Sequence, residues 1–155
     1  MPRETITRRA ADNVYLHRDF HCALNEALDY LDANYGAAAV REYLRRFAAS
    51  YHAPLTAAIC RRGLPALREY LEEIYRIEGG RMKLAGDADQ LRLEVLECPA
   101  VVHIRRQGRQ PCARFVETVR TVYATICTGT PFVFTLLDYD PATGAGVRLF
   151  KRRLP

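Results

Sequence analysis

The chain has 155 residues, a formal charge of +5 and an apolar fraction of 49%. This length and apolar content are typical of one globular domain and exclude an intrinsically disordered protein. No apolar run reaches the roughly 18 residues that a membrane-spanning helix needs, so we expect no membrane partner. No apolar stretch follows the charged residues at the start of the chain, which predicts no signal peptide and a cytoplasmic location.

The positive charge is carried almost entirely by arginine, since Lys83 and Lys151 are the only lysines. The basic stretches are short, and the aromatic residues follow apolar stripes. Nucleic-acid-binding domains usually concentrate basic side chains on one face, so this distribution disfavours a nucleic acid as partner. The five cysteines are odd in number and include no CxxC pair, which disfavours a disulfide framework and favours a reducing compartment.

The first half of the sequence has the apolar spacing of helices. Residues 1–13 are polar and are expected to form a loose arm ahead of a single domain over residues 14–155. Helices are predicted over about 16–35, 38–51, 54–62 and 65–78, and glycines end the first, third and fourth of them. The side chains expected to face inward include His17, His21, Leu24, Leu28, Leu31, Tyr35, Val40, Tyr43, Leu44, Phe47, Leu67, Tyr70, Leu71, Ile74 and Ile77.

In the second half the apolar period shortens to two residues, as in β-strands. Leu91, Leu93 and Val95 alternate with charged residues after the turn cluster 86–89, which predicts a β-hairpin. A short helix over 99–106, a longer one over about 112–128, and a second hairpin over 132–139 and 147–152 follow. This order predicts an α+β domain in which an N-terminal helical half packs with a four-stranded antiparallel sheet in ββααββ order.

Two common catalytic motifs are missing from the sequence. Ser50 is the only serine and no GxSxG is present, which excludes a serine nucleophile elbow. The glycine pair Gly79-Gly80 precedes a predicted strand and not a helix, so no phosphate-cradling loop is indicated.

Histidine and cysteine provide the candidate metal ligands. His17 and His21 are four residues apart, a helical spacing that can direct two imidazoles at one ion. Cys98 is predicted to cap a helix, where the helix dipole would lower the pKa of its thiol and favour a nucleophile or a metal ligand. His103 follows on the same helix, so His21, Cys98 and His103 could hold zinc or another divalent metal with an open position for water. The alternative is that His17 and His21 lie in a surface turn, that Cys98 caps the helix and packs, and that His103 bonds to solvent.

Two further features bear on catalysis and binding. Glu117 has Arg114 and Arg120 three residues before and after it, which favours a surface ion pair over a general base. The tyrosines could line a pocket for a flat ligand or form the rim of a core. They are Tyr15, Tyr30, Tyr35, Tyr43, Tyr51, Tyr70, Tyr75, Tyr123 and Tyr139.

Several stretches resemble a known family. They are His17-Arg-Asp-Phe-His21, Leu28–Gly36, Glu97-Cys-Pro-Ala-Val-Val-His103 and Thr128–Gly144. Together they resemble bacterial proteins grouped with the L-2-amino-thiazoline-4-carboxylate hydrolases. That resemblance implies hydrolytic opening of a small cyclic amidine to an N-carbamoyl amino acid, with Cys98 in the Cys-Pro position of the family. The element order more distantly resembles 4-vinyl-reductase-like ligand-binding domains, which implies a small-molecule sensor or carrier that could bear zinc.

These observations predict a hydrolase of a small cyclic C–N substrate, assisted by a metal or a thiol. Cys98 and Glu117 are the candidate catalytic residues, and His21, Cys98 and His103 are the candidate metal ligands. One alternative is a non-enzymatic domain that binds or senses a small molecule. Another is a helper subunit of a larger complex, and the oligomeric state, a homo-oligomer included, is left open.

Overall fold

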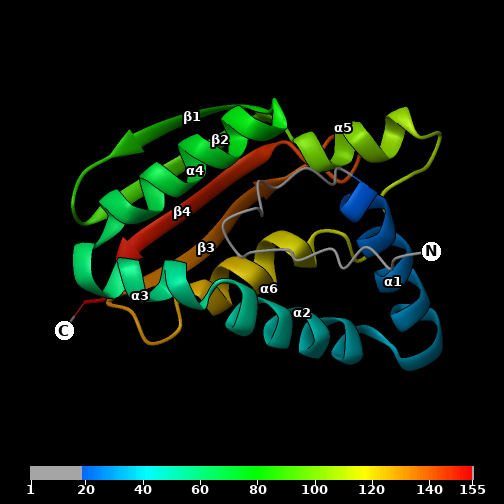
Figure 1. The fold of residues 1–155 in the computed structure, drawn as a ribbon, viewed down its shortest axis with the longest axis horizontal. Helices are drawn as coiled ribbons and strands as arrows, with labels where there is room; N and C mark the ends of the chain where they lie inside the picture. The colour runs from blue at the N-terminus through cyan, green and yellow to red at the C-terminus, as the bar shows by residue number, and fades with distance from the viewer. Residues whose placement is uncertain (1–18, 155) are drawn as a thin grey trace, which may run out of the picture.

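Six helices and a four-stranded antiparallel sheet make up the part of the chain that this computed structural model describes, residues 19–154 (Figure 1). The fold class is therefore α+β, as predicted. The predicted arm over 1–13, His17 and the start of the first predicted helix lie outside the described residues. The elements are α1 (Asp19–Tyr35), α2 (Ala37–Tyr51), α3 (Ala53–Arg62), α4 (Leu64–Glu78), β1 (Arg81–Gly86), β2 (Gln90–Glu97), α5 (Pro99–Arg106), α6 (Glu117–Ile126), β3 (Phe132–Tyr139) and β4 (Gly146–Arg152).

Most element boundaries agree with the prediction, but α6 is shorter than expected. It begins at Glu117 and not near Cys112. The backbone N–H of Cys112 donates to the side-chain oxygen of Asn25 at 2.8 Å, and the bonds that follow join residues three apart. Such bonds form tight turns, so the segment before Glu117 is a series of turns that leads into the helix.

The apolar stripes of the helices are confirmed in the main, with two exceptions. Leu28, Val40 and Leu44 are completely buried, as expected. Tyr35 and Tyr43 were predicted to face inward and are 67% and 41% exposed. Tyr35 is the last residue of α1, where the chain turns away at Gly36. Tyr43 precedes Leu44 by one residue, a rotation of about 100° on a helix, and therefore lies off the buried stripe.

The two predicted hairpins are confirmed, and their central strands lie next to each other. The strand order is β1-β2-β4-β3, so β2 pairs with β4 in the middle of the sheet. Side chains alternate between the two faces of a strand, and in β4 the buried positions are Gly146, Arg148 and Phe150. Arg148 pairs in register with Leu93 of β2 and lies on the same face as Phe150. The sheet therefore directs one arginine toward the interior.

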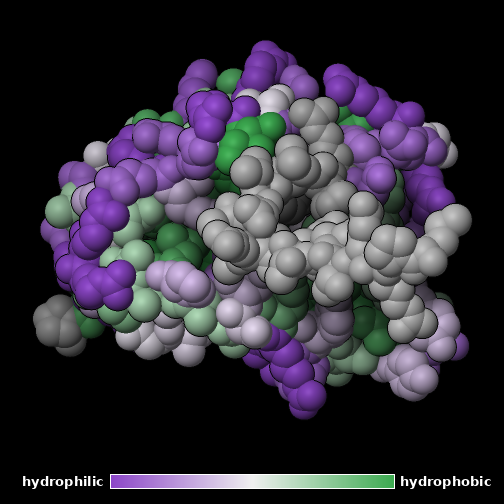
Figure 2. Space-filling model, in the orientation of Figure 1, coloured by the Kyte–Doolittle hydropathy of each residue, from purple (hydrophilic) through white to green (hydrophobic). Residues whose placement is uncertain are grey.

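Helices from both halves of the chain cover the inner face of the sheet. α6 packs against β3, α2 packs against α6, and α4 contacts β1 and β2, while α1 reaches α5 at the other end (Figure 1). In the space-filling view, hydrophilic side chains gather along the edge where α4, β1 and α5 lie (Figure 2). None of the helices within residues 19–154 is both long and apolar enough to span a bilayer.

Candidate functional site: a cavity between the helices and the sheet

A cavity of about 530 Å³ lies between the helices and the sheet. α1, α2, α4 and α6 contribute most of its wall, and the start of α5 and the central strand β4 complete it. The wall is mainly apolar and aromatic, with Leu44, Phe47, Ile74, Val119 and Val122 among its residues. The titratable groups in the wall, apart from tyrosine, are His21, His52, Glu78, Cys98 and Arg148.

Arg148 lies at the sheet end of this cavity and is 1% exposed. Its Nη2 donates to the carbonyl oxygen of Gly144 at 3.3 Å. Its Nε and Nη1 have no hydrogen-bond partner among the described residues, and no described carboxylate lies within ion-pair distance. A buried guanidinium with free donors is costly, because water no longer solvates its charge.

A glycine brings the loop of the second hairpin close to the start of α5. Gly144 has a φ of +70°, and a Cβ placed there would lie 2.7 Å from the Cβ of Cys98 and 2.8 Å from Val101. Only a residue without a side chain fits this approach and this backbone conformation. Gly144 therefore allows the loop to pack closely against Cys98, and its own carbonyl oxygen accepts the hydrogen bond from Arg148.

Cys98 is the residue before α5, as predicted, but its ionisation is the reverse of the prediction. The thiol is buried, and burial raises its pKa above the ordinary value. The backbone N–H groups of Val101 and Ala100 and the charge of Arg148 act to lower the pKa, but loss of solvation outweighs them. The prediction of a reactive thiolate is therefore wrong. At neutral pH Cys98 is a protonated thiol in the cavity wall.

Two tyrosines share the sheet end of the cavity with Arg148. Burial raises the pKa of both Tyr75 and Tyr123, while the positive charge of Arg148 acts in the opposite direction on each. The two rings line the cavity, Tyr75 from α4 and Tyr123 from α6. Both hydroxyls therefore stay protonated at neutral pH. The carboxylate of Glu78, which also lines the cavity, acts on the same two tyrosines and raises their pKa, opposite in sign to Arg148.

Aromatic rings form the helical end of the wall. Phe20 stacks on Phe47 with ring centroids 6.0 Å apart, and Phe47 stacks on Tyr51 at 5.3 Å. His52 contacts the ring of Tyr70 edge-on at 5.8 Å, and burial lowers the pKa of His52, so its imidazole is neutral at pH 7. These rings give this end of the cavity flat, uncharged faces.

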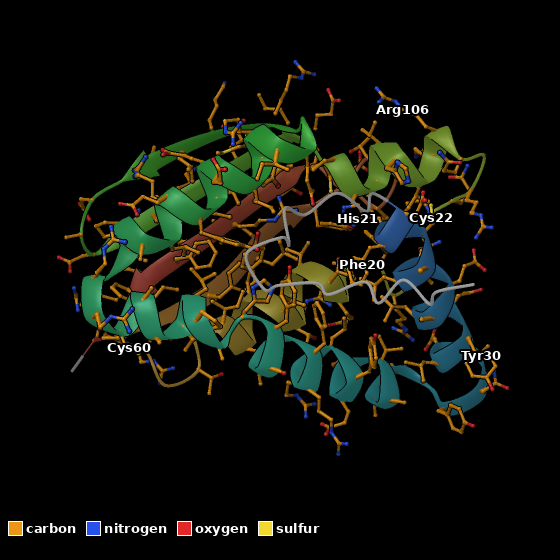
Figure 3. The ribbon with its side chains drawn as sticks, in the orientation of Figure 1. Phe20, His21, Cys22, Tyr30, Cys60 and Arg106 are labelled. Carbon is orange, nitrogen blue, oxygen red and sulfur yellow. The ribbon has the colours of Figure 1, made fainter. Side chains whose placement is uncertain are left out.

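His21 is on the inner side of α1, beside Phe20 (Figure 3). Its Nε2 is 3.4 Å from Oε1 of Glu78, which also lines the cavity. Cys22 points to another side of α1, as the helical rotation predicts, and the exposed Cys60 lies at the far end of the molecule (Figure 3). His21 and Glu78 therefore form a polar pair in an otherwise aromatic part of the wall.

The three predicted metal ligands are divided between two places. His21 and Cys98 line the cavity, whereas His103 is not among the described lining residues. The Nε2 of His103 lies 3.5 Å from Oδ1 of the exposed Asp19. Within residues 19–154 no group of three or more histidine, cysteine, aspartate or glutamate side chains is arranged to hold a metal ion. A zinc site at His21, Cys98 and His103 stays a prediction.

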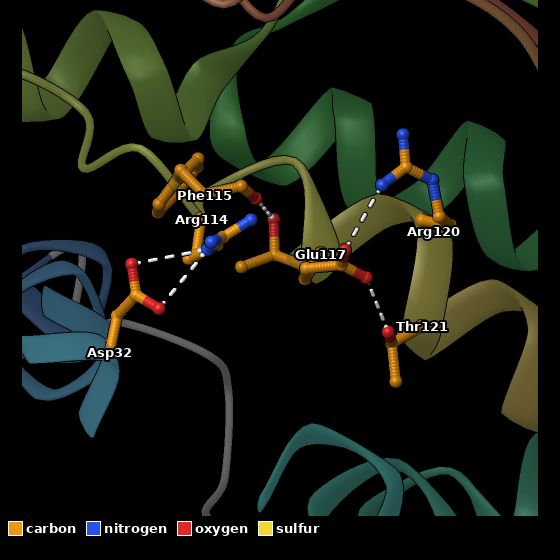
Figure 4. Close-up of polar contacts among 7 residues, drawn as sticks. Asp32, Arg114, Phe115, Glu117, Arg120 and Thr121 are labelled. Atoms are coloured by element: carbon orange, nitrogen blue, oxygen red, sulfur yellow. Dashed lines mark hydrogen bonds and ion pairs between the residues drawn. The ribbon is translucent and has the colours of Figure 1, made fainter. Parts of the chain in front are cut away.

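Glu117 is buried, which corrects the expectation of a surface ion pair. It is 3% exposed, accepts a hydrogen bond from Oγ1 of Thr121 at 2.7 Å and pairs with Nη1 of Arg120 at 3.0 Å (Figure 4). Arg114, the other expected partner, pairs instead with Asp32 at 3.1 Å. Because α6 begins at Glu117 and packs against α2, the carboxylate is enclosed at the helix start. It is not among the described residues that line the cavity.

The sequence prediction did not select Arg148. The strand over 147–152 was predicted, and its alternation contained the signal, because Arg148 is two residues before Phe150 and must share its face. An arginine shortly before the basic stretch Lys151-Arg152-Arg153 is ordinarily expected to be solvated. The burial of Arg148 depends on β4 being a central strand, and the pairing of β2 with β4 decides that.

Comparison with protein-family models, curated proteins and solved structures gave no match for this chain. The resemblance to the L-2-amino-thiazoline-4-carboxylate hydrolases and to 4-vinyl-reductase-like domains stays a prediction. The cavity and its side chains are therefore the features of the molecule that bear on its function.

Proposed function

We propose that this protein is a small-molecule-binding domain whose cavity encloses the flat, mainly apolar body of a ligand. The observation that carries the proposal is the cavity of about 530 Å³ with an apolar and aromatic wall. Natural ligand sites are concave, mostly apolar and of roughly 300–1,000 Å³. Burial of apolar ligand surface contributes about 25 cal/mol per Å² to binding, before the cost of association.

The aromatic end of the wall favours a planar ligand. The rings of Phe47 and Tyr51 stack with their planes only 15° apart, and Phe20 adds a third face within 28° of Phe47. Offset stacking on such faces adds about 1 kcal/mol beyond burial of area. A fused or substituted aromatic ring fits these faces better than a flexible chain does.

Binding is favoured over hydrolysis by the state of the candidate catalytic groups. Cys98 has a raised pKa and is protonated at neutral pH, which weakens it as a nucleophile. Glu117 already accepts hydrogen bonds from Thr121 and Arg120, and it is not among the described residues that line the cavity. Hydrolysis of a cyclic C–N substrate stays a prediction. Of its two candidate catalytic residues, Cys98 lies in the cavity wall and Glu117 is not among the described lining residues.

The proposal is tested with N-phenyl-1-naphthylamine, a neutral aromatic probe that fluoresces when it leaves water. We expect saturable binding to the intact chain and at least a tenfold loss of affinity in Val122→Trp, because that side chain points into the cavity. Ala124→Trp is the matched control, since Ala124 is exposed on the same helix and not among the described lining residues. Thr118→Phe fills the same wall if Val122→Trp fails to fold.

Two outcomes contradict the proposal. One is the absence of saturable fluorescence with the intact protein. The other is equal loss of affinity in Val122→Trp and Ala124→Trp, which would place the probe outside the cavity. Thermal unfolding of each variant shows whether a loss of binding comes from a loss of folded protein.

A further inference from the structure

Arg148 is a buried cation in the wall of the proposed ligand cavity. It is 1% exposed, and its Nε and Nη1 have no partner among the described residues. We infer that the ligand carries a carboxylate and that this carboxylate pairs with Arg148 at the sheet end of the cavity. The inference rests on the proposed function, because it names the chemical class of the ligand that the same cavity binds.

The free donors make an anionic partner favourable. The guanidinium of arginine is always charged and presents a planar fork whose parallel N–H groups match the two oxygens of a carboxylate. In Arg148 one nitrogen bonds to the carbonyl oxygen of Gly144, and two remain free. Because Arg148 has already lost its water in the folded protein, a carboxylate gains the attraction of a poorly screened charge without further desolvation of the arginine.

The surrounding charges favour a single negative charge over a doubly charged phosphate. Among the described lining residues the other basic groups are His21, which lies 3.4 Å from Glu78, and His52, whose pKa is lowered by burial. Glu78 is an acid in the same cavity and repels any ligand anion, a dianion more strongly than a monoanion. One guanidinium therefore balances one carboxylate, and a phosphate dianion would lack a second cation.

The two ends of the cavity then have different roles. Rings such as Phe47 and Tyr51 hold the flat body of the ligand, and Arg148 fixes its orientation through the carboxylate. Tyr75 and Tyr123 lie at the same end with protonated hydroxyls, which can donate to a carboxylate as well. The ligand class is a planar aromatic monocarboxylate.

The test compares 2-naphthoate, 2-naphthamide and 2-naphthyl phosphate by isothermal titration at pH 7. The first two have the same ring and nearly the same shape, but only naphthoate is charged. We expect naphthoate to bind about tenfold or more tightly than naphthamide, since a hydrogen bond to a charged group contributes about 1.5–3 kcal/mol. Naphthyl phosphate is expected to bind more weakly than naphthoate.

Variants of Arg148 assign that preference to one side chain. Arg148→Met should remove the preference for naphthoate and change naphthamide affinity less than about threefold, because it keeps the apolar volume. Arg148→Lys keeps the charge but not the fork, so an intermediate preference is expected. Arg152→Met on the same strand is the matched control, since the side chain of Arg152 is 47% exposed and pairs with Asp89.

The outcomes separate this inference from the proposed function. If naphthoate and naphthamide bind the intact protein equally, the carboxylate assignment is wrong and the binding cavity stands. If naphthyl phosphate binds most tightly, the ligand is a phosphate and not a carboxylate. If none of the three compounds binds but N-phenyl-1-naphthylamine does, the inference fails and the proposed function stands. If that probe also fails to bind, both fail. Retention of the naphthoate preference in a folded Arg148→Met also overturns the assignment.

Discussion

Two buried charged side chains, Glu117 and Arg148, occupy opposite kinds of environment. Glu117 is 3% exposed, and its carboxylate bonds to Thr121 and pairs with Arg120. Arg148 is 1% exposed and makes one hydrogen bond, to the carbonyl oxygen of Gly144. Both charged groups have lost most of their contact with water. Only in Glu117 do hydrogen bonds and an ion pair within the protein replace the lost hydration.

The difference separates a structural charge from one available to a ligand. A satisfied buried ion stabilises the elements that it joins, here the first turns of α6. A buried ion with free donors lowers stability until something else pairs with it. Stability measurements can therefore distinguish the two sites without knowledge of the ligand.

The largest effect is expected where the backbone supports Arg148. Gly144→Ala should lower the free energy of unfolding by about 3 kcal/mol, because a Cβ there adds a clash with Cys98 to the strain of a positive φ. Gly129→Ala is the control, since Gly129 has a φ of +78° and nothing within 4 Å of an added Cβ, so about 1 kcal/mol is expected. Urea unfolding measures both. Equal losses would show that the loop does not approach Cys98 closely.

Removal of the satisfied charge should also destabilise the fold. Glu117→Ala is expected to lower the free energy of unfolding by about 2 kcal/mol, because the buried hydroxyl of Thr121 loses its acceptor. Glu117→Gln keeps an acceptor oxygen and should cost about half as much. Urea midpoints of the two variants give the comparison, and unchanged stability in both would make the buried network energetically neutral.

Removal of the unsatisfied charge should have the opposite sign. Arg148→Met is expected to raise the free energy of unfolding by about 1 kcal/mol, since a hydrophobic side chain replaces a desolvated cation. The measurement is urea unfolding without ligand. A loss of about 2 kcal/mol or more would show that Arg148 holds the fold together as Glu117 does, and would remove the contrast between them.

The smallest effect concerns the reactivity of Cys98. Burial raises the pKa of its thiol, and the charge of Arg148 partly opposes that rise. Arg148→Met should therefore raise the pKa further, lower the thiolate fraction at pH 8 and slow alkylation by iodoacetamide about threefold. Peptide mass spectrometry follows the modification of Cys98. Glu117→Gln is the control and should leave the rate unchanged, and a faster reaction in Arg148→Met would contradict the sign.

Periodicity and turn chemistry predicted most of the elements. The positions of Gly63 and Gly79 marked the ends of α3 and α4, and alternation at Leu91, Leu93 and Val95 marked a strand with one buried face. These signals are local, since they depend on spacing and backbone freedom within a few residues. The start of α6 was predicted too early. The N–H of Cys112, where the helix was expected to begin, instead donates to Asn25, which lies 87 residues before Cys112 in the chain and is therefore not a local signal.

The candidate site could be predicted only in part. His21 and Cys98 were selected and do line the cavity, but Arg148 was missed and Glu117 was placed at the surface. A helical cap predicts a low pKa for a cysteine only where water reaches the thiol, and burial under Gly144 reverses the shift at Cys98.

Local sequence patterns were sufficient to predict the α+β class, the two hairpins and most of the inward stripes of the helices, because each follows from the side-chain period of a local element. The tertiary structure alone decided that β2 pairs with β4, that α6 encloses Glu117 and that the helices leave a cavity above Arg148. Burial and solvation depend on which distant elements pack together. An identical alternation of charged and apolar residues exposes an arginine on an edge strand and isolates it from water on a central one.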